Sequence, residues 1–447
     1  MCVSDCMKTV IRGGMAGIVL LLLLSVRTAA QETDLAVWVC PAGGYEEEST
    51  VRILAEDYQK THPDVRVNTK VLDPVAGPEE ISSVLGTEDA PDIVIAAPED
   101  IVTRWGSQGY MVDLTELWDE QTEAETDGEV KEACISPDGI YYQMPLFRDV
   151  YTMAINYEAF RDTGVLQYLN EDAHSWKDSG FIDCVLVMRE HELQYEKKDI
   201  TVCRIPCRDQ KDQRQFMSFI TNLSNGSLID DMRTSYTLSS SSVKNSFAIL
   251  RNMQGKGLSY APDMTSEEEL EEFLNGELPV TFFWSYYRNR KYADQTDFTV
   301  FPMMYPNSKN KPVLSGDIRG FGVTDSGDEK KIKEAIEFVR FFTEDPDEYS
   351  RAVSLSQCFP VRSRLKGTYV GGLYQDDPDS RLFRFFMDYF KDYTPTMPLF
   401  SELEAEWPGL VRQIAEGNGI GELTAAIDEK LNTRLEAEYG LHAADME

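Results

Sequence analysis

The chain has 447 residues, with 77 acidic side chains against 43 lysines and arginines, and a formal net charge of −34. Its length allows two or three domains, and a hydrophobic content of 42% is ordinary for a globular protein, which argues against extensive disorder. A field of this sign repels phosphate backbones, so nucleic acids and anionic membrane surfaces are not expected as partners.

The N-terminus carries an apolar run at residues 13–26, preceded by Lys8 and Arg12 and followed by Arg27. A basic start, a short apolar run and small residues after it are typical of a secretory signal. The run is shorter than the roughly 20 residues that span a bilayer. We therefore expect residues 1–30 to be a signal peptide and the protein to be exported, extracellular or at the cell surface of a bacterium. An uncleaved N-terminal tether is the alternative, and no cysteine follows the run to serve as a lipid attachment site.

Histidines and cysteines give little support for a metal centre. The four histidines are far apart in the sequence, at positions 62, 174, 191 and 442. Cys203 and Cys207 look like a close pair, but in a strand they would lie about 13 Å apart, which is too far for a disulfide. We expect both to be packing residues, and we expect no metal and no cofactor.

The first part of the chain alternates strands and helices. Residues 35–40 suit a buried strand, residues 51–58 repeat apolar side chains at helical spacing, and His62-Pro63 ends that helix. Residues 65–71 alternate as a strand does, residues 91–98 form an apolar run bounded by prolines, and a helix begins near Ile101. This rhythm predicts an α/β domain with a mainly parallel sheet.

Later segments continue the same pattern. Residues 150–157 read as a strand that carries the chain into a second region, and residues 181–188 as a helix. Residues 279–287 and 298–304 read as strands. Residues 328–342 are the clearest amphipathic helix, for which Ser326 and Glu329 predict a capping box.

Five segments, in order, resemble the extracellular solute-binding proteins of ABC importers, in the sugar-binding cluster that includes maltose-binding protein. They are the opening strand with Trp38 and its helix, residues 90–117, residues 138–165, the Gly-Glu and aromatic strand of 273–287, and residues 321–352. Each motif alone is weak, and the order of all five carries the resemblance. It is thinnest across residues 166–260.

The resemblance implies an α/β, two-lobed, periplasmic-binding-protein-like fold with crossing hinge strands. Lobe 1 would comprise residues 31–146 and 316–350, and lobe 2 residues 150–312 and 360–447. Ligand would be trapped between the lobes by hinge closure.

Sugar recognition needs aromatic faces and planar polar groups. The resemblance puts the stacking position on Tyr286, which in a strand would share a side with Trp284. Both can equally be core aromatics.

Charged candidates lie at the crossover and at the end of a strand. Asp149 matches a cleft carboxylate of the family, and Arg148 beside it could clamp hydroxyls or a ligand carboxylate, with a surface ion pair as the less favoured alternative. Glu99 and Asp100 follow a strand's carboxyl end, where α/β sheets place ligands, or act as acids at a helix N-terminus.

Two further candidates are aromatic. Tyr45 follows Ala42 and Gly43, which occupy a loop that is polar in maltose-binding protein, a departure that argues against maltose. Phe400 is a candidate wall of the second lobe, with a core role as the alternative.

The sequence therefore predicts a non-enzymatic, monomeric protein that captures a carbohydrate and delivers it to ABC permease subunits. A binding protein for a peptide, polyamine or organic ion is the first alternative. A secreted glycoside hydrolase is the second, because two suitably spaced carboxylates suffice for that chemistry.

Overall fold

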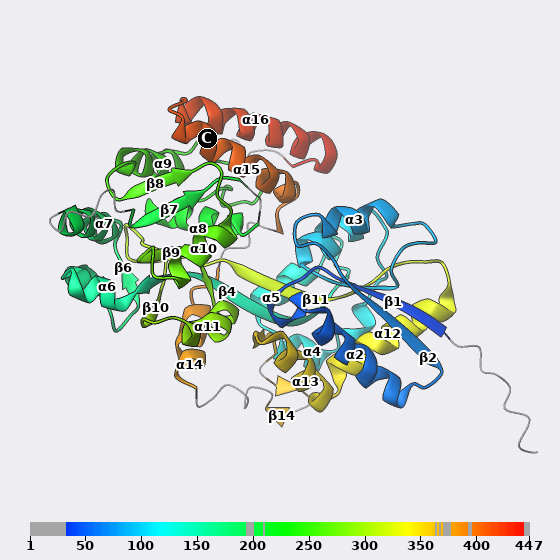
Figure 1. Cartoon of the computed structure of the whole chain (residues 1–447). Coiled ribbons are helices and arrows are strands. Elements are labelled where there is room, and N and C mark those ends of the chain that lie inside the picture. Colours follow the sequence, from blue (N-terminus) through cyan, green and yellow to red (C-terminus); the bar gives the residue numbers. More distant parts are fainter. Residues whose placement is uncertain are drawn as a thin grey trace, which may run out of the picture.

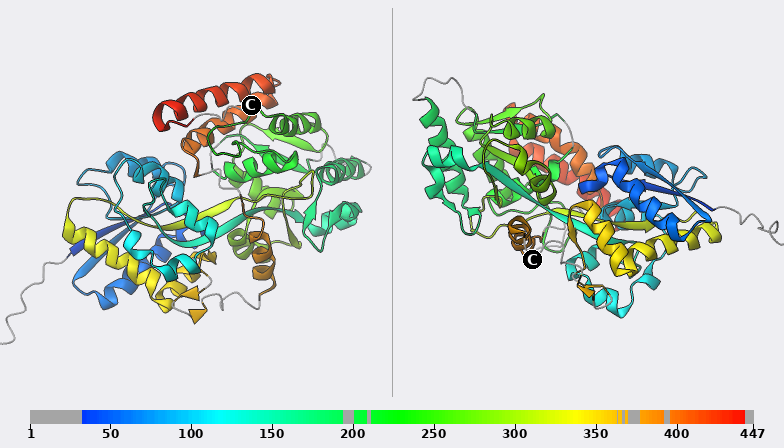
Figure 2. Two further views of the ribbon diagram at one scale, coloured as in Figure 1. Left: turned by 180° about the vertical axis from the view of Figure 1, so that it is seen from behind. Right: turned by 60° about the horizontal axis from the view of Figure 1, so that its bottom comes forward.

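The computed structural model describes residues 33–193, 201–208, 211–362, 364–365, 368–369, 377–391 and 396–441. The predicted signal peptide and His442 lie outside these residues. The chain folds into two α/β lobes that share one sheet, and both lobes can be followed in each of the three views (Figures 1 and 2).

The first lobe holds the N-terminal elements. In chain order they are β1 (Thr33–Val39), η1 (Gly43–Glu46), α2 (Glu48–Thr61), β2 (Val65–Val71), α3 (Gly77–Val84), β3 (Ile93–Ala96), η2 (Glu99–Gly106), η3 (Thr115–Leu117), α4 (Glu120–Glu125) and α5 (Gly128–Cys134). β1 pairs in parallel with both β2 and β3, which confirms the predicted parallel arrangement. The predicted helix stop is also confirmed, since His62 caps the end of α2.

The second lobe holds most of the central part of the chain. Its elements are α6 (Tyr157–Asp162), η4 (Val165–Tyr168), β5 (Leu169–Asn170), β6 (Ser175–Trp176), α7 (Asp178–Leu193), β7 (Cys203–Pro206), α8 (Gln213–Leu223), α9 (Ser241–Met253), β8 (Leu258–Ala261), α10 (Ser266–Leu274), β9 (Val280–Ser285), α11 (Tyr286–Tyr292), η5 (Ala293–Gln295) and β10 (Val300–Met303). The C-terminal helices α15 (Phe400–Ala415) and α16 (Ile420–Tyr439) pack against α8 and α9.

The long strand β4 (Met144–Asn156) joins the lobes. Its first half pairs with β11 (Gly316–Val323) and β12 (Phe359–Pro360), and its second half with β9 and β10. The crossover is tight at Gly316, where a Cβ atom would lie 2.1 Å from the carbonyl oxygen of Asp149. Only glycine fits there, and two strands can thus cross between the lobes side by side.

The remaining elements return to the first lobe and then to the second. They are α12 (Glu329–Glu344), α13 (Pro346–Ser356), β13 (Arg364–Leu365), β14 (Thr368–Tyr369) and α14 (Pro378–Met387). The predicted capping box of α12 is wrong, because Asp328, and not Ser326, accepts the first-turn N–H groups. We propose that α13, β13 and β14 belong to lobe 1, since α13 contacts α12 and η1, β13 contacts α4, and β14 pairs with β13. The other predicted lobe boundaries remain proposals.

All six cysteines of the described residues are buried and free of disulfides. Cys203 and Cys207 both pack in the core, as expected. Within the described part of the chain, no helix combines the length and apolar character needed to cross a membrane. The same residues hold no group of three or more His, Cys, Asp or Glu arranged to bind a metal ion.

Candidate functional site: a charged cavity between the lobes

A cavity of about 640 Å³ lies where the two lobes face each other. Its walls come from the loop after β1 and from η2 in lobe 1, from β4 and β11 at the crossover, and from α8, α11 and α15 in lobe 2. The volume is within the roughly 300–1,000 Å³ of pockets that hold small molecules.

The lining combines many charges with aromatic faces. Ten carboxylates line the cavity, from Glu46, Glu79, Glu99, Asp100, Asp149, Asp212, Asp317, Glu402, Glu404 and Glu438. Six cations accompany them, from Arg104, Lys211, Arg214, Arg288, Arg319 and Arg434. The aromatic rings are those of Phe147, Tyr151, Tyr287, Phe400 and Tyr439. Planar polar groups beside rings can bond hydroxyls and cover an apolar sugar face.

Arg214 on α8 links the two lobes. Its guanidinium bonds Glu404 on α15 through two nitrogens, at 2.5 and 3.0 Å, and it also bonds Glu99 on η2 across the cavity. Burial lowers the pKa of the guanidinium, but the two carboxylates outweigh it and raise that pKa well above its ordinary value. Arg214 also lies over the ring of Phe400, 5.3 Å from its centroid.

A second contact between the lobes lies at Glu46 on η1. Its carboxylate accepts a hydrogen bond from the Tyr287 hydroxyl at 3.4 Å and is 3.5 Å from the Lys291 ammonium. Tyr287 and Lys291 belong to α11, and the ammonium lies 5.2 Å from the centroid of the Tyr287 ring. The described conformation therefore has the lobes bridged by polar contacts through Arg214 and through Glu46.

Two further ion pairs line the inner wall. Asp317 and Arg319 are neighbours on one side of β11, with 3.0 Å between their charged atoms. Arg288 on α11 bonds Asp212 at 2.6 Å. Each inner arginine therefore already has a carboxylate partner from the protein.

Asp149 lies at the crossover and fixes the start of α11. Its carboxylate accepts hydrogen bonds from the backbone N–H groups of Val150, Tyr286 and Tyr287, at 2.8, 3.0 and 3.2 Å. Burial raises the pKa of Asp149 to about 6, although these bonds and the Ser285 hydroxyl oppose the rise. The residue thus joins the hinge strand to a helix of lobe 2.

Asp100 is also buried and lies in the first turn of η2. Burial, with a smaller effect of Glu99, raises the pKa of its carboxyl to about 7, against the opposing fields of Arg214, Arg104 and Arg319. Glu99 and Asp100 are acids at a helix N-terminus, and they also line the cavity, so their role in ligand binding stays a prediction.

Four of the predicted site residues meet at the cavity: Asp149, Glu99, Asp100 and Phe400. The other four lie outside its lining, so the structure does not bring the whole predicted set together. Trp284 and Tyr286 are completely buried, and they bond Asn289 and Ser380 respectively. Tyr45 is also buried and donates to the carbonyl of Ala352. Arg148 forms an ion pair with Asp127.

The aromatic positions were misplaced because the strand ends earlier than predicted. Ser285 accepts a hydrogen bond from the N–H of Arg288 and is the N-cap of α11, so Tyr286 and Tyr287 are helical. Strand alternation no longer applies there, and Tyr287, not Tyr286, reaches the cavity. The serine is a common N-cap residue and was the available signal.

The arginines of the cavity were missed altogether. Arg214 lies in the region where the resemblance is thinnest, and Arg288 and Arg319 come from α11 and β11. The pairings of Arg214 and Arg288 depend on contacts between segments that are far apart in the sequence, with a separation of 190 residues for Arg214 and Glu404 and 76 for Arg288 and Asp212.

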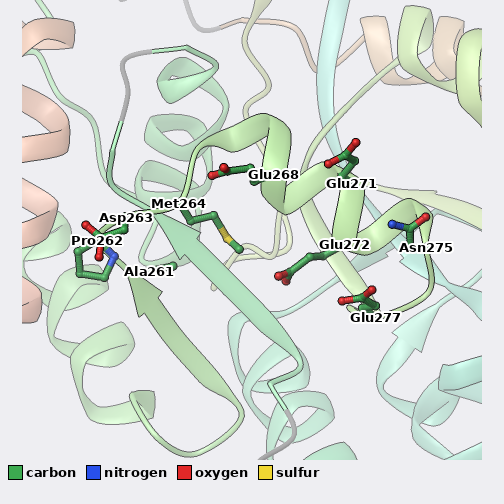
Figure 3. Close-up of a pocket in the computed structure, with 9 residues that line it drawn as sticks. All are labelled: Ala261, Pro262, Asp263, Met264, Glu268, Glu271, Glu272, Asn275 and Glu277. Carbon is green, nitrogen blue, oxygen red and sulfur yellow. The ribbon is translucent and has the colours of Figure 1, made fainter.

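A second hollow, the α10 groove, lies on the surface of lobe 2. It has a volume of about 580 Å³ and is lined by Ala261, Pro262, Asp263, Met264, Glu268, Glu271, Glu272, Asn275 and Glu277 (Figure 3). Its charged lining is acidic only, and Arg204 pairs with Glu272 at 2.7 Å. It involves one lobe and none of the hinge strands.

Comparisons with known proteins agree with this architecture. Residues 43–181 match the model of the family described as bacterial extracellular solute-binding protein. No curated protein matches the chain in sequence.

Among solved structures, the GacH receptor of Streptomyces glaucescens, described with acarbose, has a TM-score of 0.73 at 14% identity over 91% of this chain and 99% of that chain. UgpB from Mycobacterium tuberculosis, in complex with glycerophosphocholine, has a TM-score of 0.73 at 15% identity over 91% and 99%. The MalE domain from Bdellovibrio bacteriovorus, bound to maltotriose, has a TM-score of 0.70 at 11% identity over 91% and 100%. The predicted resemblance and the two-lobed α/β fold are confirmed.

Proposed function

We propose that this chain is an exported solute-binding protein that captures a carbohydrate between its lobes and delivers it to an ABC permease. The observation that carries the proposal is the cavity whose walls come from both lobes and from the strands that join them. Such an arrangement binds by hinge closure and needs no covalent chemistry. We propose no enzymatic activity and a monomeric protein.

The lining supports a ligand rich in hydroxyl groups. Arginines, carboxylates and Gln215 offer planar donors and acceptors, and Tyr151, Tyr287 and Phe400 offer rings. A polar ligand that leaves these groups unpaired would bind weakly, because buried polar groups need partners. Proteins of similar fold are described with acarbose and maltotriose.

Two observations support the proposal that the protein is exported. The matched family is described as extracellular, and residues 1–30 carry the pattern of a signal peptide. Expression of the full chain with analysis of the N-terminus of the exported product would test this part of the proposal.

Isothermal titration calorimetry against a panel of sugars tests the main proposal. We expect at least one sugar to bind, and Glu99→Gln to weaken that binding at least tenfold, because it removes the charge that holds Arg214 across the cavity. Glu271→Gln, in the α10 groove, is the matched control and should bind normally. Failure of every sugar and every other small solute to bind would overturn the proposal.

The second candidate function is binding of a solute other than a sugar by the same hinge closure. The excess of carboxylates in the lining favours a cationic or zwitterionic ligand, and UgpB, of similar fold, is described with glycerophosphocholine. Binding of a polyamine, peptide or organic ion, with no sugar bound, would select this candidate. Release of reducing sugar from a glycoside panel would instead select the hydrolase alternative.

A further inference from the structure

We propose that the ligand carries a protonated amine in addition to its hydroxyl groups, and that Asp100 receives this amine. The inference rests on the proposed function and names the chemical class of solute that the cavity takes. Three features of the lining support it. Among the described residues, the inner arginines are already paired with carboxylates, Asp100 has one ion-pair partner at 3.9 Å, and the Oε1 atom of Gln215 has no hydrogen-bond partner.

The arginines of the inner wall are already neutralised. Arg214 bonds two carboxylates, Arg319 pairs with Asp317, and Arg288 pairs with Asp212. An anionic ligand would have to displace a protein carboxylate from its arginine. With ten carboxylates and six cations around the cavity, a positive charge lowers the electrostatic energy of the site and a negative charge raises it.

Asp100 is a weakly paired carboxylate of the inner wall. The residue is only 9% exposed and lines the cavity, yet no group in the described part of the chain donates a hydrogen bond to its carboxylate. The nearest cation is Arg104, at 3.9 Å, and that guanidinium also bonds Glu79. Asp149, by contrast, accepts three backbone N–H bonds. A buried carboxylate is costly unless a cation or several donors reach it.

Gln215 on α8 supplies an independent sign of a missing donor. The residue is 2% exposed and lines the same cavity, and its Oε1 atom has no hydrogen-bond partner. Its amide nitrogen donates to Asp212 at 3.3 Å, which leaves the oxygen as an acceptor. Both the unpartnered acceptor of Gln215 and the weakly paired carboxylate of Asp100 can accept N–H donors, and an ammonium group supplies donors and charge together.

The experiment compares matched amine and hydroxyl probes by calorimetry at pH 7.5. The pairs are 1-amino-1-deoxysorbitol against sorbitol, and glucosamine and galactosamine against glucose and galactose. We expect the amine to bind at least tenfold more tightly in one pair or more. Asp100→Asn keeps the shape and an acceptor oxygen but removes the charge, so it should reduce this preference to threefold or less. Glu271→Gln should leave it unchanged.

The pH dependence of amine binding is a further test, because the affinity would not change with pH if Asp100 had only a structural role. The charged and titratable groups that face Asp100 are Glu99 and Arg104 on η2, Arg214 on α8, Arg319 on β11 and Cys40 after β1. Before ligand binds, the pKa of the Asp100 carboxyl is raised to about 7. Its ionised fraction thus grows from about 0.1 at pH 6 to about 0.9 at pH 8, while the alkylamine probe stays protonated. The affinity for 1-amino-1-deoxysorbitol should rise up to about tenfold over this range, and sorbitol should not follow it.

The outcomes separate this inference from the proposed function. If the neutral sugar binds as tightly as its amine partner in every pair, or if Asp100→Asn keeps the amine preference, the inference is wrong and the solute-binding function stands. The same holds if no amine probe binds while another solute of the general panel does. Only the failure of all solutes would overturn both. Thermal unfolding of Asp100→Asn in the absence of ligand verifies that the variant is folded.

Discussion

The inter-lobe cavity and the α10 groove both gather carboxylates, but the surroundings of those carboxylates differ. In the cavity several of them are buried or half-buried and pair with arginines from other elements, as Glu404 and Glu99 do with Arg214. In the groove, Glu271 and Glu277 are exposed to solvent, which screens their repulsion (Figure 3). An acidic surface therefore indicates solubility, whereas a buried mixture of both signs, held by two lobes, indicates a binding site.

The largest expected effect is at Arg214. Arg214→Met would leave Glu404 and Glu99 buried without their cation, which should cost about 3–5 kcal/mol of unfolding free energy. Arg204→Met is the matched change beside the groove, and it should cost less than about 1 kcal/mol because that ion pair is partly solvated. Urea denaturation measures both variants. Equal losses would mean that the two surfaces do not differ as described.

A smaller loss is expected at Asp149. Asp149→Ala removes the acceptor of three backbone N–H groups at the junction of β4 and α11, and should cost about 1–3 kcal/mol. Asp149→Asn retains one acceptor oxygen and should recover part of the loss. Thermal unfolding of the two variants is the measurement, and an alanine variant as stable as the wild type would contradict the proposed role of this carboxylate at the hinge.

On α10 itself, Glu269 provides a comparison within one helix. It points into the core, where it accepts a hydrogen bond from Thr281 at 2.7 Å, and burial raises its pKa to about 8. Because the folded state then binds a proton that the unfolded state has lost, this group reduces stability progressively from about pH 4.5 to about pH 8.

Glu269→Gln should therefore gain stability relative to the wild type as the pH rises from 6 to 9. Glu268→Gln, on the groove side of the same helix, should show no such gain. Urea denaturation at the two pH values measures the difference, and an equal difference for both variants would place Glu269 in a solvated environment.

The smallest effect is expected in the groove. Glu271→Gln changes an exposed side chain with no close partner among the residues described, and should alter the unfolding free energy by no more than about 0.5 kcal/mol. Chemical denaturation would detect a larger change. A loss beyond 1 kcal/mol would show that the groove has a structural role.

Local sequence pattern predicted most of the elements of this protein, because hydrophobic periodicity reflects burial along a single segment. The strands at residues 33–39, 65–71 and 93–96, and the long helix α12, follow that rule. The cleft position of Glu99 and Asp100 followed from their place after a strand, since the ends of neighbouring strands meet at one edge of a sheet. The strand predicted to continue through Tyr286 ends instead at Ser285, because this serine is the N-cap of α11.

The charge of −34 and the order of five motifs were determined by the sequence alone, and they limited the partners and the fold. The tertiary structure decided which of the many acids matter. The residues next to Arg214, Glu99 and Glu404 in the sequence do not reveal that these three side chains pair. They meet only in the folded protein, where α8, η2 and α15 surround one cavity. Burial then sets the chemistry of Asp100, because the cost of an uncompensated carboxylate depends on its distance from water and from cations, which no single segment of sequence encodes.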